Sequence, residues 1–136
     1  MNISKRRPLR ALALLGIIVV ISSVALAQTS TRIGFKRGAT RSTVSGNLNN
    51  FKSRRIYLVK VRDGQTMRTE QIGGARRPIT IFIRDRDGNN VGDSDASCNN
   101  RKEISPTRAG DYTIEVVECQ KADPWRGRFT FRVAVR

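Results

Sequence analysis

The sequence predicts an all-β fold, a small antiparallel and jelly-roll-like β-sandwich of about seven or eight strands. Several runs alternate apolar and polar residues with a period of two, which is typical of a strand that buries one face. Gly, Asn and Asp separate these runs at short intervals, as turn residues do in sandwiches and barrels. After residue 27, no stretch of the chain has a convincing helical period.

The clearest strand covers residues 112–117, which a Gly-Asp turn precedes. Tyr112, Ile114 and Val116 fall on one face of it, and polar residues fall on the other. The run leads to Cys119 and then through a loop to the last predicted strand. Two long-range links therefore meet in this stretch.

Four strands are expected before residue 75. Thr and Val favour the second of them, which two Asn residues end. In the third, Tyr57, Val59 and Val61 share one face, and the Asp63-Gly64 turn that follows needs a residue that tolerates positive φ. In chain order, these strands are residues 33–35, 41–48, 55–62 and 65–72.

The second half of the chain continues the same pattern. Pro78 suits the start of a strand in which three Ile residues face one way, and an Asp87-Gly88 hairpin turn follows it. In chain order, the strands expected here are residues 78–84, a short piece at Val91, 102–104, 112–117 and 128–136. The predicted core comprises Tyr57, Val59, Val61, Ile81, Ile83, Tyr112, Ile114, Val116, Phe131 and Val133.

Residues 1–27 have the features of a signal peptide. Four basic residues between positions 5 and 10 precede an apolar run, which ends in the small-x-small pattern Ala25-Leu26-Ala27. We expect cleavage before Gln28, which leaves residues 28–136 as one periplasmic or secreted domain with no stable membrane span. The alternative is an uncleaved anchor, because the run is near the lower length limit for a span.

The exported chain is strongly basic. Four of the 26 Lys and Arg residues and none of the 11 acidic residues lie in residues 1–27, so the mature charge is 22 − 11 = +11. Export argues against nucleic acid as the partner, and anionic envelope polymers, lipid head groups or an acidic protein surface are better candidates. The alternative is a charge that only keeps the protein soluble and loosely attached to surfaces.

Cys98 and Cys119 are the two cysteines, and in an exported chain they predict a disulfide. A closed loop of about 20 residues implies roughly 3 kcal/mol of stabilisation in the chain-entropy model. The alternative is two separate free thiols.

Four segments carry a family resemblance: YLVKVRDGQTM at 57–67, IFIRDRDGN at 81–89, AGDYTIEV at 109–116 and FTFRV at 129–133. With them the chain resembles the bacterial pre-peptidase C-terminal domain and the periplasmic inhibitors of goose-type lysozyme, which are small secreted β-sandwiches. The resemblance implies the fold and a non-catalytic role. Goose-type lysozymes are often basic, so the charge of this chain weighs against the inhibitor reading through long-range repulsion.

The sequence lacks residues that several catalytic mechanisms need. It contains no His, which excludes Ser-His and Cys-His nucleophile pairs and a His-based zinc site. The acidic residues cluster in turns, where Asp has an ordinary structural role. We therefore expect no enzymatic activity, no cofactor and no metal. The oxygen-rich loop over residues 85–95 is a weak calcium candidate, because its glycine and closing position do not match an EF-hand loop.

The loop before the last strand is the predicted binding site. Its members are Lys121, Trp125, Arg126 and Arg128, and Trp and Arg are the residue types that dominate protein interfaces. The alternative is that Trp125 folds back to cap one end of the core. Three basic pairs near predicted strand ends could add to an anionic-ligand surface or remain solvated loop charges: Arg54-Arg55, Arg76-Arg77 and Arg101-Lys102.

These observations favour a non-enzymatic exported binding module of the cell envelope, whose basic surface recognises an anionic or protein partner. A periplasmic inhibitor of goose-type lysozyme is the first alternative, and a structural or accessory envelope protein is the second. The sequence contains no indication of an oligomeric state.

Overall fold

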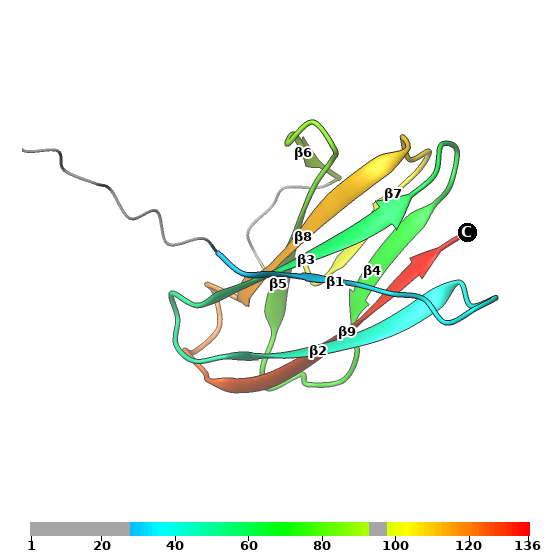
Figure 1. The fold of residues 1–136 in the computed structure, drawn as a ribbon. Helices are drawn as coiled ribbons and strands as arrows, with labels where there is room; N and C mark the ends of the chain where they lie inside the picture. Colours follow the sequence, from blue (N-terminus) through cyan, green and yellow to red (C-terminus); the bar gives the residue numbers. More distant parts are fainter. Residues whose placement is uncertain (1–27, 93–97) are drawn as a thin grey trace, which may run out of the picture.

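The computed structural model describes residues 28–92 and 98–136 and places them in two β-sheets packed face to face (Figure 1). This confirms the predicted β-sandwich. These described residues contain no helix, and therefore no helix that could cross a membrane. The predicted signal peptide and positions 93–97 of the calcium candidate lie outside the described residues.

Nine strands make up the described part of the chain. They are β1 (Ser30–Arg32), β2 (Arg41–Leu48), β3 (Arg54–Val61), β4 (Met67–Gln71), β5 (Ile79–Arg84), β6 (Asn90–Val91), β7 (Arg101–Ile104), β8 (Gly110–Glu118) and β9 (Gly127–Val135). Their bounds follow the expected pattern with one exception: the strand expected at residues 33–35 was wrong, because the first strand is β1 at Ser30–Arg32 and pairs with β3. The side chains of Ile33 and Phe35 follow the strand and pack on the core.

The first sheet has the order β1-β3-β8-β5-β6. The most clearly predicted strand, β8, lies between β3 and β5 and pairs antiparallel with both. β1 pairs parallel with β3. Arg32 of β1 forms a bidentate ion pair with Asp111 of β8, in which both N–O distances are 2.8 Å. This contact lowers the pKa of the Asp111 carboxyl and holds the edge strand in place.

The second sheet has the order β2-β9-β4-β7, with β2 at one edge (Figure 1). Every pair in it is antiparallel. β9 pairs with β2 along its whole length and with β4 over its second half. The last strand of the chain therefore joins residues that are far apart in sequence.

The core lies between the inner faces of the two sheets. All ten predicted core residues are buried, because the period of two sends alternate side chains of each strand inward. Tyr57 from the first sheet packs edge-on against Phe131 from the second, with ring centroids 5.2 Å apart. Burial raises the pKa of the Tyr57 phenol.

A disulfide links Cys98 to Cys119, as the sequence predicted. The segment that follows Cys98 also touches both sheets. The Asn99 carbonyl accepts from the N–H of Ile81 in β5, and the Asn100 carbonyl accepts from the N–H of Gln71 in β4, each at 2.9 Å. This segment therefore ties the two layers together along one side of the sandwich.

Candidate functional site

Trp125, at the centre of the predicted binding loop, is half-buried and packs against the core. Its indole Nε1–H donates to the Pro78 carbonyl at 3.0 Å. Its backbone N–H donates to the carboxylate of buried Glu118 at 3.2 Å. The side chain therefore closes one end of the sandwich, which is the capping role that the sequence left open.

The same end of the molecule carries a shallow surface depression of about 330 Å³, which we call the end hollow. Trp125 and Arg126 line it together with Phe51 from the β2–β3 turn. Phe51 is 45% exposed, which is unusual for a large apolar side chain. The residues that line the end hollow are Asn49, Asn50, Phe51, Pro124, Trp125 and Arg126.

Two of the four predicted binding residues thus meet in the end hollow. Lys121 is exposed in the β8–β9 loop, and Arg128 is exposed on β9 opposite Asn47 of β2, and neither lines it. Phe51 was missed by the sequence analysis. An aromatic residue in a turn of Asn, Lys and Ser was the available signal, since such a turn has little core to bury it in.

A second candidate surface lies on the outer face of the sheet β2-β9-β4-β7. Its centre is a depression of about 180 Å³, which we call the arginine hollow. An adjoining depression of about 230 Å³ shares Arg68, Ala134 and Arg136 with it and adds Thr66. The residues that line the arginine hollow are Arg41, Arg68, Thr69, Glu70, Arg101, Arg132, Ala134 and Arg136.

Strand register brings these arginines together. Ala134 of β9 pairs with Arg41 on one side and with Arg68 of β4 on the other. Two residues before Ala134 on β9, Arg132 pairs with Glu70 of β4, which in turn pairs with Arg101 of β7. Residues two apart on a strand share a face, so Arg132, Ala134 and Arg136 lie in line on the outer surface.

Positive charge exceeds negative charge around the arginine hollow. Glu70 lies 3.2 Å from Arg132 and 4.0 Å from Arg101, and Glu103 pairs with Arg68. Within residues 28–92 and 98–136, Arg41 and Arg136 form no ion pair. Because exposed ion pairs are weak, the five arginines retain a net positive field at this face.

The three basic pairs of the sequence do not gather there. Arg54 lies 3.5 Å from Glu115 on the first sheet, and Arg55 donates to the Asn47 carbonyl. Arg76 and Arg77 follow β4, in its connection to β5. Only Arg101 lines the arginine hollow, whereas its neighbour Lys102 is buried on the opposite side of β7.

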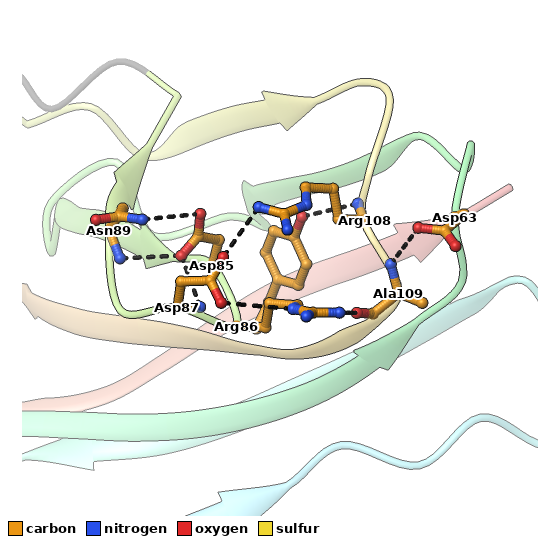
Figure 2. A network of polar contacts seen from close by, with 8 residues as sticks. Asp63, Asp85, Arg86, Asp87, Asn89, Arg108 and Ala109 are labelled. Carbon is orange, nitrogen blue, oxygen red and sulfur yellow. Dashed lines mark hydrogen bonds and ion pairs between the residues drawn. The ribbon is translucent and has the colours of Figure 1, made fainter.

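The start of the calcium candidate is a hydrogen-bonded turn (Figure 2). The Asp85 carboxylate accepts from the backbone N–H groups of Asp87 and Asn89, each at 2.9 Å, and the Asn89 bond in particular lowers its pKa. Asp87 pairs with Arg108 at 2.9 Å, which ties the turn to the connection before β8. No cluster of three potential metal ligands occurs in the part of the chain that the structure describes.

Asp63 also holds the connection between β7 and β8. Its carboxylate accepts from the N–H of Ala109 at 2.7 Å, and the Ala109 carbonyl accepts from Arg86 at 3.1 Å (Figure 2). Acidic groups at this end of the sandwich are thus committed to turns and ion pairs.

No family model matches this chain, and no curated protein matches it. Solved structures do match. A periplasmic inhibitor of g-type lysozyme from Aeromonas hydrophila aligns with a TM-score of 0.58 and 15% identity over 79% of this chain and 96% of that chain. An inhibitor of the same description from Salmonella Typhimurium aligns with a TM-score of 0.56 and 12% identity, over 79% and 97%.

A further match is the pre-peptidase C-terminal domain of a collagenase from Bacillus anthracis. It aligns with a TM-score of 0.53 and 17% identity over 80% of this chain and 96% of that chain. The resemblance that four sequence segments predicted is therefore confirmed in three dimensions. At these identities the likeness establishes architecture alone: the chain has the β-sandwich fold shared by these lysozyme inhibitors and this pre-peptidase C-terminal domain.

Proposed function

We propose that this protein is a non-enzymatic, exported binding protein of the cell envelope that recognises an anionic partner through the outer face of the sheet β2-β9-β4-β7. The observation that carries this proposal is the arginine hollow, where four arginines lie around Ala134 and a fifth, Arg101 of β7, lines the same depression. A charge of this density raises the local concentration of anions and speeds their encounter.

Three observations support export. The first 27 residues have the composition of a signal peptide, and the chain forms a disulfide, which persists in oxidising compartments. Two matched structures are described as periplasmic inhibitors. We accordingly place the mature protein in the periplasm or outside the cell.

The test is a binding titration with the full chain, expressed for export and purified in its oxidised form. An acidic polysaccharide and a polymer of glycerol phosphate are the probes, and a neutral polysaccharide is the control. We expect saturable binding to an anionic polymer that weakens at least about tenfold between low and physiological salt, because salt screens exposed charges. Binding that is equally strong for the neutral polymer would contradict the proposal.

Two charge-matched variants locate the surface. Arg41→Gln/Arg136→Gln removes two charges from the arginine hollow, and Lys52→Gln/Lys60→Gln removes two exposed charges outside the second sheet. We expect the first variant to lose most of the affinity and the second to lose little. Equal losses would mean that net charge alone, rather than this face, governs adhesion, as expected of an accessory envelope protein.

A second function is favoured by a different observation. The end hollow combines exposed Phe51 with Trp125 and Arg126, which is the composition of a protein-binding hot spot, and the fold matches inhibitors of g-type lysozyme. Inhibition of such an enzyme would use this end rather than the arginine hollow. Stoichiometric inhibition of g-type but not hen-type lysozyme at physiological salt, lost in Phe51→Ser, would establish it. No inhibition at a large molar excess would exclude it.

A further inference from the structure

We propose that the arginine hollow is a binding site for a phosphate group carrying two negative charges, as in a phosphomonoester. This inference rests on the proposed function and specifies its ligand chemistry. It follows from the placement of four arginines around Ala134.

Ala134 is the floor of the site. Neighbouring strands lie about 4.8 Å apart and residues two apart on a strand are separated by about 6.8 Å. The register therefore sets Arg41 and Arg68 on the two lateral sides of Ala134. Arg132 lies two residues before Ala134 on β9, and Arg136 lies two residues after it, directly past the end of the strand. The methyl side chain leaves the space between the four long side chains open, and all five residues line the hollow.

The number of donors favours a tetrahedral oxyanion. Each guanidinium presents a planar fork of N–H groups that suits two oxygens at once. A carboxylate has two oxygens and satisfies one or two such forks. A phosphomonoester has three terminal oxygens, which can accept from three or four guanidiniums that approach from different sides.

The charge balance favours a dianion. Glu70 offsets Arg132 and Arg101 in part, and Glu103 pairs with Arg68. Among the described residues, Arg41 and Arg136 carry positive charge with no acidic partner. Five arginines and two carboxylates give a net side-chain charge of 5 − 2 = +3 around the hollow, which suits a phosphomonoester better than a diester, which carries one negative charge.

The neighbouring row shows the contrast. There Glu70 stands between Arg132 and Arg101 and occupies the place that a ligand anion would take. In the row of Ala134, the corresponding position between Arg41 and Arg68 holds a side chain with no charge and no hydrogen-bonding group. Arg68 in that row pairs with Glu103, so the open part of the row is the side formed by Arg41 and Ala134.

The experiment is an NMR titration of the oxidised protein with inorganic phosphate at pH 7.5 and constant ionic strength. Dimethyl phosphate and acetate are the comparison anions. We expect one saturable phosphate site with shifts centred on Ala134, and at least tenfold weaker binding of both comparison anions. Equal affinity for all three, or shifts spread over every basic surface without saturation, would overturn the proposal.

Two variants and one control test the geometry. Ala134→Leu fills the floor without changing charge, and Arg41→Gln removes one lateral donor from an edge strand. We expect each to weaken phosphate binding about tenfold or more, while Arg128→Gln, on the same face of β9 but outside the hollow, leaves it within twofold. Unchanged phosphate binding in both Ala134→Leu and Arg41→Gln, with unchanged melting temperatures, would contradict the assignment.

The outcomes separate this inference from the proposed function. Polymer binding that persists without a saturable phosphate site would overturn the inference and leave the function standing. A saturable phosphate site without polymer binding would support the inference and contradict the proposed function. Vesicles that contain phosphatidic acid, a phosphomonoester lipid, distinguish the source: vesicle binding that Ala134→Leu abolishes would assign the phosphate to a lipid. A saturable phosphate site without vesicle binding would assign it to a phosphomonoester on another molecule.

Discussion

The indole N–H of Trp125 donates to the backbone carbonyl oxygen of Pro78 at 3.0 Å. The same carbonyl accepts from the N–H of Cys119, also at 3.0 Å. One backbone oxygen thus joins the β8–β9 loop, the disulfide and the start of β5. This relationship gives Trp125 a structural role in addition to its place in the end hollow.

Replacing Trp125 should therefore reduce stability. We expect Trp125→Phe to lower the free energy of unfolding by about 1 kcal/mol through the lost hydrogen bond. Trp125→Ala should lower it by about 2–3 kcal/mol, because packing against the core is lost as well. Urea denaturation measures both, and exposed Phe51→Ser should stay within about 0.5 kcal/mol of the wild type. A Trp125→Ala protein as stable as the wild type would refute the capping role.

Gly46 on β2 marks a close approach between the sheets. A Cβ atom built on it would lie 2.6 Å from Phe129 Cζ and would also collide with the Tyr57 hydroxyl. We expect Gly46→Ala to cost about 1–3 kcal/mol, because two buried aromatic side chains must shift. Gly34→Ala meets no atom within 4 Å and serves as the control in the same denaturation series. Equal stability of the two variants would show that the aromatic cluster repacks freely.

Reduction of the Cys98–Cys119 disulfide should destabilise the protein. The closed loop of about 20 residues predicts a loss of roughly 3 kcal/mol in the unfolding free energy. Denaturation with and without reductant measures the loss, and a Cys98→Ser/Cys119→Ser variant should match the reduced protein and ignore reductant. If reductant destabilised that variant as well, its effect on the wild type would have another origin.

Asp85 predicts a specific pH dependence. Its pKa is lowered in the folded state by backbone hydrogen bonds, so its contribution is present above the ordinary aspartate value of about 4 and is lost as the pH falls through the folded value. We expect Asp85→Asn to lower the melting temperature by a constant amount above pH 5 and by progressively less below pH 4. Asp123→Asn, in an exposed loop, is the control for the same change of net charge. A difference that grows toward low pH would have the wrong sign.

Glu70 should limit the affinity of the arginine hollow for anions. Glu70→Gln removes the carboxylate that lies between Arg101 and Arg132, and it keeps the length of the side chain. We expect anion binding to strengthen about three- to tenfold, with a small change in melting temperature because exposed ion pairs contribute little to stability. Titration with inorganic phosphate measures this effect. Weaker binding in Glu70→Gln would mean that the carboxylate positions the arginines rather than competing with the ligand.

Local sequence determined the core and the strands after residue 40, whereas β1 lies at Ser30–Arg32 rather than at the expected residues 33–35. Alternation with a period of two fixes which side chains of a strand share a face, and burial of the apolar face then sets the register between strands. All ten predicted core residues are buried for this reason. The cysteine pair was equally decided by sequence, since the chain offers each cysteine a single partner.

Tertiary structure alone decided the candidate sites. Arg41, Arg68, Arg101, Arg132 and Arg136 are spread over almost a hundred positions, and no local pattern connects them. They meet because β9 pairs with β2 and β4, and β4 with β7, in one particular register. The role of Trp125 was ambiguous for a related reason, because an indole can face either the solvent or the core. The carbonyl that accepts its N–H belongs to Pro78, which precedes β5 and is far from Trp125 in sequence. Sequence specifies the faces of strands because their period is local, whereas a surface shared by four strands exists only after long-range pairing.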